Sequence, residues 1–365
     1  MVHKIHVNLN IGSYDISIGF NILKNFFIST VLLKNTNNII ITNHTIKNII
    51  IKNKYYSVNE NTKNIPLFSI PDGESYKNLK EVENIISFLL KKPYGRDVTL
   101  IAIGGGVVGD ITGFVASIYQ RGVNFFQIPT TLLAQVDASI GGKTGVNHVL
   151  GKNMIGSFWQ PKGVLIDIDF LSTLPKEHLI AGMAEIVKYA IIFDYKFFVW
   201  LEKNYFKILQ LQKETLLFCI KKCCELKVKV VESDEKESGL RFFLNLGHSF
   251  AHAIETHTGY GAWLHGEAVS VGLVMSAYLS VQLNILHKDY LYRIKTILYK
   301  IGLPVVGPKN MLPQDYLKCM LRDKKVLSGR IRLILPISIG QVELISSIDN
   351  NKILQVVKQF QERKY

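Results

Sequence analysis

The feature that most constrains the fold is a glycine-rich turn that directly follows a short apolar run. The run from Val98 to Ile103 is too short for a helix and fits a strand buried on both faces, as parallel sheets require. Gly104-Gly105-Gly106-Val107-Val108-Gly109-Asp110 follows it and precedes a helix-compatible stretch, Ile111 to Ser117. The G-x-G-x-x-G spacing lets backbone N–H groups approach a pyrophosphate and aims a helix N-terminus at it. We therefore expect an α/β domain that binds a dinucleotide.

The glycine motif alone leaves an alternative open. A tight turn needs glycine for its backbone angles whether or not it binds a ligand. The acidic residue that usually lies about 20 positions downstream would fall in Val123 to Pro129, which contains none. The motif needs support from other segments.

Polar residues after two further strand-like runs supply that support. Asp72 and Glu74 follow a run that ends at Ile70, which places their carboxylates to accept hydrogen bonds from ribose hydroxyls. Thr130 and Thr131 follow another run, again at the carboxyl end where open α/β sheets bind ligands. Each residue alone also fits a helix cap or a turn, but together they describe one ligand edge.

The spacing of apolar residues divides the chain into an α/β half and a helical half. At 365 residues, with 48% hydrophobic composition, the chain is long enough for two folded domains. The first third predicts strands over His3 to Leu9, Tyr14 to Ile18, Asn38 to Thr42 and Leu67 to Ile70, and a helix over Leu79 to Lys91. Later periodicity predicts helices over Leu179 to Ile192, Tyr195 to Val231, Gly247 to His257 and Gly266 to Leu286, then a hairpin over Arg330 to Leu335 and Gln341 to Ile345. We expect a Rossmann-like domain at 1–174 and a mainly α-helical domain at 175–365.

The formal net charge of +14 calls for an anionic partner. Nucleic acid, an acidic membrane surface and small phosphorylated ligands compete for that role. The lysines are scattered among Asn and Ile, as in Lys47 to Lys54, which favours an ordinary solvated surface over a binding patch. No long window lacks polar interruption, and Met1 to Asn10 holds no apolar stretch of signal-peptide type. We expect a cytoplasmic protein without a membrane span.

The cysteines do not form a recognisable metal or disulfide pattern. Cys219, Cys223 and Cys224 lie in one helix-like segment without the paired C-x-x-C spacing of a structural zinc site, and Cys319 stands apart. All are expected to be reduced packing residues.

A stretch dense in glycine, lysine and small polar residues, Gln135 to Lys152, predicts a loop that wraps around a polar substrate. Its two lysines, Lys143 and Lys152, are suited to contact a phosphate or a developing oxyanion. The alternative is an idle surface loop, which the apolar anchors Ile155 and Phe158 disfavour.

Histidines and carboxylates in the second half predict a metal site. His248 and His252 lie one helical turn apart, and His265 follows near the start of the next helix. Imidazole nitrogens with a carboxylate suit zinc in a catalytic site that keeps a fourth position open. Glu185 is the best carboxylate, because it lies in an apolar stretch where an unpaired charge is costly. Spacing favours His248 and His252 as joint ligands and leaves His257 and Glu267 open.

Together, these motifs resemble the 3-dehydroquinate synthase family. The matching segments are Asp72 to Lys77, Gly104 to Asp110, Pro129 to Asp137, Gly141 to Thr144, Gly151 to Asn153, Leu244 to His248, His265 to Glu267 and Asp323 to Lys325. The resemblance implies an NAD-binding α/β domain followed by a helical metal-binding domain. The first 65 residues carry little of it.

The resemblance also implies roles for particular residues. The metal, Zn²⁺ or Co²⁺, falls to Glu185, His248 and His265, and His252 moves to the neighbourhood of the substrate. NAD contacts are implied for Asp72, Gly73, Glu74, Ser75, Tyr76, Lys77, Gly106, Val107, Val108, Gly109, Asp110, Thr130, Thr131, Lys143, Lys152, Phe170, Leu171, Ser172 and Thr173. Substrate or catalytic contacts are implied for Asp137, Lys143, Lys152, Asn153, Lys188, Lys227, Arg241, Asn245, His252 and one or both of Lys324 and Lys325.

The reaction implied by the resemblance converts 3-deoxy-D-arabino-heptulosonate 7-phosphate to 3-dehydroquinate and phosphate, a step of the shikimate pathway. It proceeds by NAD-dependent transient oxidation, phosphate elimination, re-reduction, ring opening and intramolecular aldol closure. The resemblance also implies a homodimer. Two alternatives remain: a related sugar phosphate cyclase or metal-dependent polyol dehydrogenase of the same fold, and, from another class, a basic nucleic-acid-binding protein. The nucleic-acid alternative is disfavoured because the aromatic residues lie mainly in apolar, core-like runs.

Overall fold

The computed structural model describes residues 2–23, 37–52, 65–92, 94–321, 331–346 and 348–362. Contacts divide the chain into two compact units. The first comprises Met1–Pro175 with Leu216–Lys236, and the second comprises Lys176–Thr215 with Glu237–Tyr365. The units do not follow a single cut near residue 175, because most of helix α7 (Lys213–Ser233) groups with the N-terminal unit.

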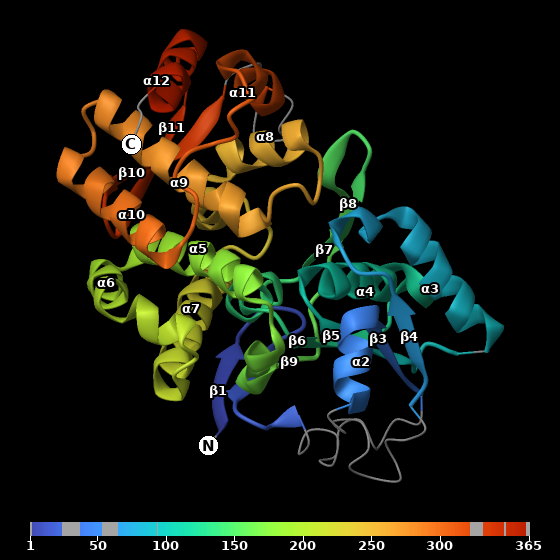
Figure 1. Cartoon of the computed structure of the whole chain (residues 1–365). Coiled ribbons are helices and arrows are strands. Elements are labelled where there is room, and N and C mark those ends of the chain that lie inside the picture. Colours follow the sequence, from blue (N-terminus) through green and yellow to red (C-terminus); the bar gives the residue numbers. More distant parts are fainter. Residues whose placement is uncertain are drawn as a thin grey trace. The chain divides into compact units, whose positions relative to one another are not determined.

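The first unit is built on a seven-stranded sheet (Figure 1). Its spatial order is β1 (Val2–Val7), β2 (Tyr14–Gly19), β9 (Gly163–Asp167), β6 (Asn124–Pro129), β5 (Thr99–Gly104), β3 (Asn38–Asn43) and β4 (Leu67–Ile70). Only the pairing of β1 with β2 is antiparallel in this sheet; the other neighbours run parallel. The predicted strands and the α/β class are confirmed.

Alternating residues send apolar side chains to both faces of the sheet, which is why the strands are apolar throughout. Ile40 packs in a core cluster with residues of α2 (His44–Lys52), while Ile39 and Ile41 pack in the opposite cluster with residues of α3 (Leu79–Lys91) and α4 (Gly106–Ile118). Helix α3 spans Leu79–Lys91 as predicted, and its N-cap Asn78 accepts a hydrogen bond from the Glu81 N–H.

The glycine turn connects β5 to helix α4 (Gly106–Ile118), as the motif predicts. Glycine is required at Gly104, because a Cβ there would lie 2.5 Å from Cγ2 of Val108. The chain runs from β3 outward to β4 on one side and from β5 outward to β6 on the other. The carboxyl ends of β3 and β5 therefore flank the switch point at which doubly wound sheets bind ligands.

The stretch expected to be a loop, Gln135 to Lys152, is instead largely ordered secondary structure. It contains a π-helical turn, Ala134–Ala138, and the first part of a hairpin formed by β7 (Lys143–His148) and β8 (Gly151–Phe158). The glycine content has a different cause from the one expected, because Gly145 pairs with Gly156 across the hairpin. A Cβ on Gly156 would lie 2.1 Å from the Thr144 carbonyl oxygen.

The second unit is mainly helical, and helix α9 (His265–Gln282) lies at its centre (Figure 1). The remaining helices are α5 (Lys176–Phe193), α6 (Tyr195–Leu209), α8 (His248–Thr258), α10 (Lys288–Ile301), α11 (Pro313–Met320) and α12 (Asn350–Glu362). The predicted C-terminal hairpin is present as β10 (Arg332–Ser338) and β11 (Gln341–Ser346). Among helices of the described segments, none combines the length and apolarity needed to cross a membrane.

The single helix expected over Tyr195 to Val231 is wrong. It is two helices, because α6 ends in a turn where Leu211 has a left-handed φ of 57° and the Gln212 N–H bonds back to the Lys207 carbonyl. Glycine usually marks such an end, so a leucine in that position gave no sequence signal.

Candidate active site

Three helices of the second unit bring a carboxylate and two imidazoles together. Glu185 lies on α5, His248 begins α8 and His265 begins α9, and their ligand atoms all lie within 4.8 Å of one another. Among the described residues, these three form the group of His, Cys, Asp or Glu side chains that lies close enough together to hold one metal ion.

The distances suit a single ion. Oε1 of Glu185 lies 3.6 Å from Nε2 of His248 and 3.5 Å from Nε2 of His265. Ligand atoms at about 2.0–2.1 Å from a tetrahedral zinc are about 3.3–3.4 Å apart. The two distances from Glu185 therefore need only a small contraction around an ion.

The other ring nitrogen of each histidine has a fixed partner. Nδ1 of His248 lies 3.1 Å from the Leu246 carbonyl oxygen, and Nδ1 of His265 lies 3.0 Å from Oε1 of Glu255. Both partners are acceptors, so each Nδ1 carries the proton and each Nε2 presents its lone pair to the Glu185 side.

Glu255 is a functional candidate that the sequence reasoning missed. It lies seven residues after His248 on the same helical face, and that i, i+7 spacing was the available signal. Its carboxylate is buried.

Glycines let the three helices approach closely enough for their ligands to meet. A Cβ on Gly266, beside His265, would lie 1.8 Å from the Ala181 carbonyl oxygen, one turn before Glu185 on α5. A Cβ on Gly272 would lie 2.0 Å from the Gly247 carbonyl oxygen, next to His248. Backbone packs against backbone at both crossings.

The expectation from spacing that His252 is a joint ligand is wrong. Its ring stacks edge-on against His248, with centroids 5.6 Å apart, and it is not in the ligand group. Glu267 also lies outside the group and accepts a hydrogen bond from the Leu264 N–H at the start of α9. Lys188 is fully buried one turn after Glu185 and forms an ion pair with its other carboxylate oxygen.

In the first unit, the predicted cofactor segments follow the carboxyl ends of four parallel strands. Residues 72–77 follow β4, 106–110 follow β5, 130–131 follow β6 and 170–173 follow β9. The side chains of Phe170 and Leu171 are buried, so their surfaces belong to the interior. The hydroxyl of Thr130 is also buried and has no hydrogen-bond partner in the described part of the chain.

Lys77 connects the cofactor segments to the hairpin. Its Nζ donates to Oδ2 of Asp110 at 2.5 Å and to Oδ1 of Asn153 at 2.6 Å. Burial raises the pKa of the Asp110 carboxyl, and the Lys77 ammonium opposes that rise.

Asp137 and Lys227, both predicted substrate residues, meet in the first unit. Lys227 on α7 forms an ion pair with the Asp137 carboxylate and donates to the Asp137 carbonyl oxygen at 2.6 Å. Helix α7 thus anchors the π-helical turn that carries Asp137. One turn earlier, the Cys224 thiol donates to the Gln135 carbonyl at 3.4 Å.

The remaining predicted substrate residues divide between the units. Lys143 and Lys152 lie on the hairpin of the first unit. In the second unit, Arg241 is buried and the Asn245 amide donates to Oε1 of Glu237 at 2.8 Å. Lys324 and Lys325 lie outside the described residues.

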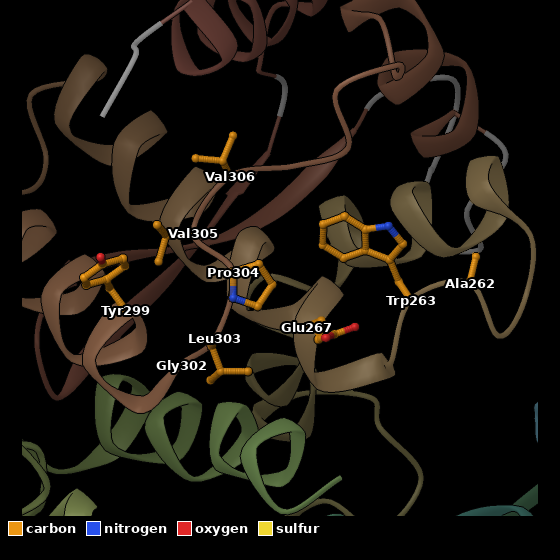
Figure 2. A pocket seen from close by; sticks show the side chains of 9 residues that line it. All are labelled: Ala262, Trp263, Glu267, Tyr299, Gly302, Leu303, Pro304, Val305 and Val306. Carbon is orange, nitrogen blue, oxygen red and sulfur yellow. The ribbon is translucent and has the colours of Figure 1, made fainter. Parts of the chain in front are cut away.

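The second unit contains a cavity of about 530 Å³ (Figure 2). Residues of the α8 to α9 connection, including Trp263, and of the segment after α10, including Pro304, line it. Glu267, its one lining carboxylate, already caps α9. None of the three metal-ligand candidates lines this cavity.

Comparison with solved structures places the fold. A 2-epi-5-epi-valiolone synthase from Streptomyces hygroscopicus subsp. jinggangensis 5008, solved with NAD⁺ and Zn²⁺ bound, matches with a TM-score of 0.87 and 26% identity, covering 98% of this chain and 99% of that one. A 2-deoxy-scyllo-inosose synthase complexed with carbaglucose-6-phosphate, NAD⁺ and Co²⁺ matches with a TM-score of 0.86 and 24% identity, covering 98% of this chain and 100% of that one. At 24% identity, the match to the 2-deoxy-scyllo-inosose synthase supports the fold and no further property.

Sequence comparison finds relatives of much higher identity than these two solved structures. A 3-dehydroquinate synthase from Buchnera aphidicola subsp. Cinara cedri (strain Cc) is 66% identical over 365 residues, which is 100% of both chains. Another, from Buchnera aphidicola subsp. Baizongia pistaciae (strain Bp), is 54% identical over 352 residues, 96% of this chain and 99% of its own. Models described as 3-dehydroquinate synthase N-terminal and 3-dehydroquinate synthase C-terminal match residues 67–181 and 182–326. With both models matched in order and relatives aligned end to end, this chain belongs to the 3-dehydroquinate synthase family.

Proposed function

We propose that this 3-dehydroquinate synthase, a carbon-oxygen lyase, converts 3-deoxy-D-arabino-heptulosonate 7-phosphate to 3-dehydroquinate and phosphate with NAD and one divalent ion, Zn²⁺ or Co²⁺. The observation that carries the proposal is the convergence of Glu185, His248 and His265 in a chain 66% identical to a synthase over its full length.

The donor set fits a metal ion. Oε1 of Glu185 is buried and has no hydrogen-bond partner among the described residues, which is costly unless a cation satisfies it. Two imidazole nitrogens and a carboxylate oxygen are ligands that zinc accepts, and three protein ligands leave one position for substrate.

The first unit fits a dinucleotide. The backbone N–H groups at the start of α4 follow Gly105, where a Cβ would lie 3.1 Å from Cγ2 of Thr131, so a side chain would fill the approach. The buried, unpartnered Thr130 hydroxyl at the same sheet edge is a ready hydrogen-bond group. The solved structures of the valiolone synthase and the inosose synthase both contain bound NAD⁺, which supports the same cofactor for this chain.

When bound, NAD would accept and return a hydride and the ion would polarise an oxygen of the substrate. The chain itself supplies cations for the substrate's phosphate and carboxylate, from Lys143, Lys152, Lys188, Arg241 and Lys227. The ion pair with Lys227 holds the Asp137 carboxylate in one orientation. His252, beside His248, is the group we assign to proton transfer near the ion.

A second candidate function is a cyclase that forms a valiolone-like or inosose-like ring, because those enzymes share the fold. A polyol dehydrogenase is a third, since a probable glycerol dehydrogenase from Sinorhizobium meliloti 1021 shares the fold with a TM-score of 0.61. Net accumulation of NADH is the property that separates the dehydrogenase from either cyclase.

The test follows phosphate release and nicotinamide absorbance together on the heptulosonate phosphate. We expect phosphate release without net NADH, loss of release with a chelator, and recovery on adding zinc or cobalt. His248→Ala should lower the rate by more than about 100-fold, because the ion contributes several kcal/mol of transition-state stabilisation. His257→Ala, an exposed histidine on the same helix, is the matched control and should retain activity. Net NADH or no phosphate release would contradict the proposal.

We also propose, from the family resemblance, a homodimer in the cytoplasm and a functional division near residue 174 between cofactor-binding and metal-binding parts. Analytical ultracentrifugation of the full chain tests the dimer.

A further inference from the structure

Asn147 occupies an irregular position in the β7–β8 hairpin. The strand register shifts between Val146, which pairs with Ile155, and His148, which pairs with Gly151. Asn147 falls in this bulge, and its backbone N–H donates to the Lys77 carbonyl oxygen at 2.8 Å. Bulges of this kind redirect a side chain away from the regular ladder.

The redirected side chain uses both ends of its amide. Nδ2 of Asn147 donates to Oε1 of Glu74 at 2.9 Å. Oδ1 of Asn147 accepts from the backbone N–H of Asn153 at 2.8 Å. One half-buried side chain therefore joins a residue of the proposed cofactor segment to a residue of the proposed substrate set.

Asn153 needs this support because its backbone is unusual. Its φ of 52° lies in the left-handed region, which asparagine tolerates better than most residues but does not favour. The Asn147 amide holds the Asn153 N–H, and Lys77 holds the Asn153 side-chain oxygen at 2.6 Å. The two contacts fix the backbone and the side chain of Asn153 separately.

We propose that Asn147 is a positioning residue that fixes Asn153 for the sugar phosphate and ties it to Glu74 of the cofactor segment. The proposal rests on the proposed function for the identities of the two ligands. Its structural part, the hold on the Asn153 backbone, does not depend on either ligand.

The test uses three variants of the full chain. Asn147→Ala removes both side-chain hydrogen bonds. Asn147→Asp keeps the acceptor for the Asn153 N–H and replaces the donor that faces Glu74 with a carboxylate. Val149→Ser changes a tip residue of the same hairpin that is 91% exposed, and serves as the matched control.

The expected results separate positioning from general damage. For Asn147→Ala we expect the KM of the heptulosonate phosphate and the dissociation constant of NAD each to rise about tenfold, because the variant loses both side-chain hydrogen bonds and the hold on the Asn153 backbone. Asn147→Asp should keep the substrate KM within about threefold and still weaken NAD. Glu74→Ala, like Asn147→Asp, should keep the substrate KM within about threefold, because the Asn147 oxygen still accepts from the Asn153 N–H.

Hydrogen exchange at the Asn153 amide provides a readout without substrate or cofactor. It should speed up in Asn147→Ala and stay slow in Asn147→Asp and Val149→Ser. Unchanged hydrogen exchange, substrate KM and NAD affinity in Asn147→Ala would overturn the proposal. A substrate KM that rises as far in Asn147→Asp as in Asn147→Ala would also overturn it. If the wild type shows the slow exchange but releases no phosphate, the proposed function fails and the hold on Asn153 stands.

Discussion

Nδ1 of His265 lies 3.0 Å from Oε1 of the buried Glu255 carboxylate. A carboxylate in this position fixes the tautomer of a metal-ligating histidine and raises the basicity of its other nitrogen. Glu255 and His265 lie on neighbouring helices, α8 and α9, so the contact also sets the direction in which the ring enters the site.

Replacing Glu255 should therefore weaken metal binding without removing a ligand. We expect Glu255→Ala to lower zinc affinity about 10–100-fold, and Glu255→Gln to lower it less, because the amide oxygen can still accept from Nδ1–H. Titration of metal-free protein against a chromophoric chelator measures the change. Glu177→Ala, an exposed position on α5, is the control. Unchanged zinc affinity in Glu255→Ala would remove the positioning role.

Gly266→Ala should separate helices α5 and α9 at the metal site. The added Cβ would lie 1.8 Å from the Ala181 carbonyl oxygen, and backbone cannot swing aside as a side chain does. We expect a loss of about 1–3 kcal/mol in the free energy of unfolding together with reduced zinc affinity, because Glu185 and His265 move apart.

Gly261→Ala provides the comparison for that variant. Gly261 has a φ of 100° and open space around its Cβ position, so alanine there introduces backbone strain without a clash. It should lower stability by about 1 kcal/mol and leave zinc affinity unchanged. Denaturant unfolding and the chelator titration, run on both variants, give the two quantities. Equal zinc affinity in Gly266→Ala and the wild type would contradict the prediction.

Local patterns predicted the parts of the fold that local forces determine. The run before Gly104 became β5, and Leu79 to Lys91 became α3, because apolar periodicity and caps act within a few residues. The sequence did not predict the helix break at Leu211, because no glycine or proline marks it. Gly145 contributed to the predicted loop, whereas its small size, like that of its partner Gly156, serves the close approach of two strands.

In the candidate site, too, the sequence indicated some residues and missed others. Imidazoles and a carboxylate in one half predicted a metal, but spacing chose His252, since neighbours on one helix are visible in the sequence and partners on different helices are not. Residue patterns had already proposed Glu185 and His265, and the family resemblance moved His252 out of the ligand set. Helices α5 and α9 bring Glu185 and His265 to His248. The Glu255–His265 and Asn147–Glu74 contacts form between different elements, so the sequence can mark at most one partner of each, as the i, i+7 spacing marks Glu255.

Lys77→Met should destabilise the first unit by leaving the largely buried Asp110 carboxylate without the Lys77 cation. Breaking one side of a buried pair costs about 3 kcal/mol or more, and here the side chains of Lys77 and Asp110 are only 5% and 22% exposed. Lys80→Met is the control, because Lys80 and Glu83 are 70% and 67% exposed and such pairs contribute under about 1 kcal/mol.

The loss in Lys77→Met should depend on pH. Burial already raises the pKa of the Asp110 carboxyl, and Lys77 opposes that rise, so its removal raises the pKa further. A carboxyl with a raised folded-state pKa favours the folded state below its unfolded pKa and loses that contribution as the pH rises through the folded pKa. The destabilisation should be large at neutral pH and shrink towards acidic pH. Urea unfolding at both conditions measures it, and a loss independent of pH would contradict this account.

The buried thiols of α7 should resist alkylation in the native protein. Cys219, Cys223 and Cys224 are buried, and burial raises the pKa of the Cys223 and Cys224 thiols. The thiolate is the nucleophile, so a raised pKa lowers its fraction at every pH below that value. Cys319 is only partly buried and should react first.

Mass spectrometry after brief treatment with iodoacetamide should therefore show one modified cysteine in the folded wild type and four after unfolding in guanidinium. In Cys319→Ser, native labelling should fall to background while labelling of the unfolded chain falls by one site. Rapid modification of Cys223 or Cys224 in folded Cys319→Ser would mean that α7 opens on the timescale of labelling. The support that Lys227 and Cys224 give to the Asp137 turn would then be transient, since both residues lie on that helix.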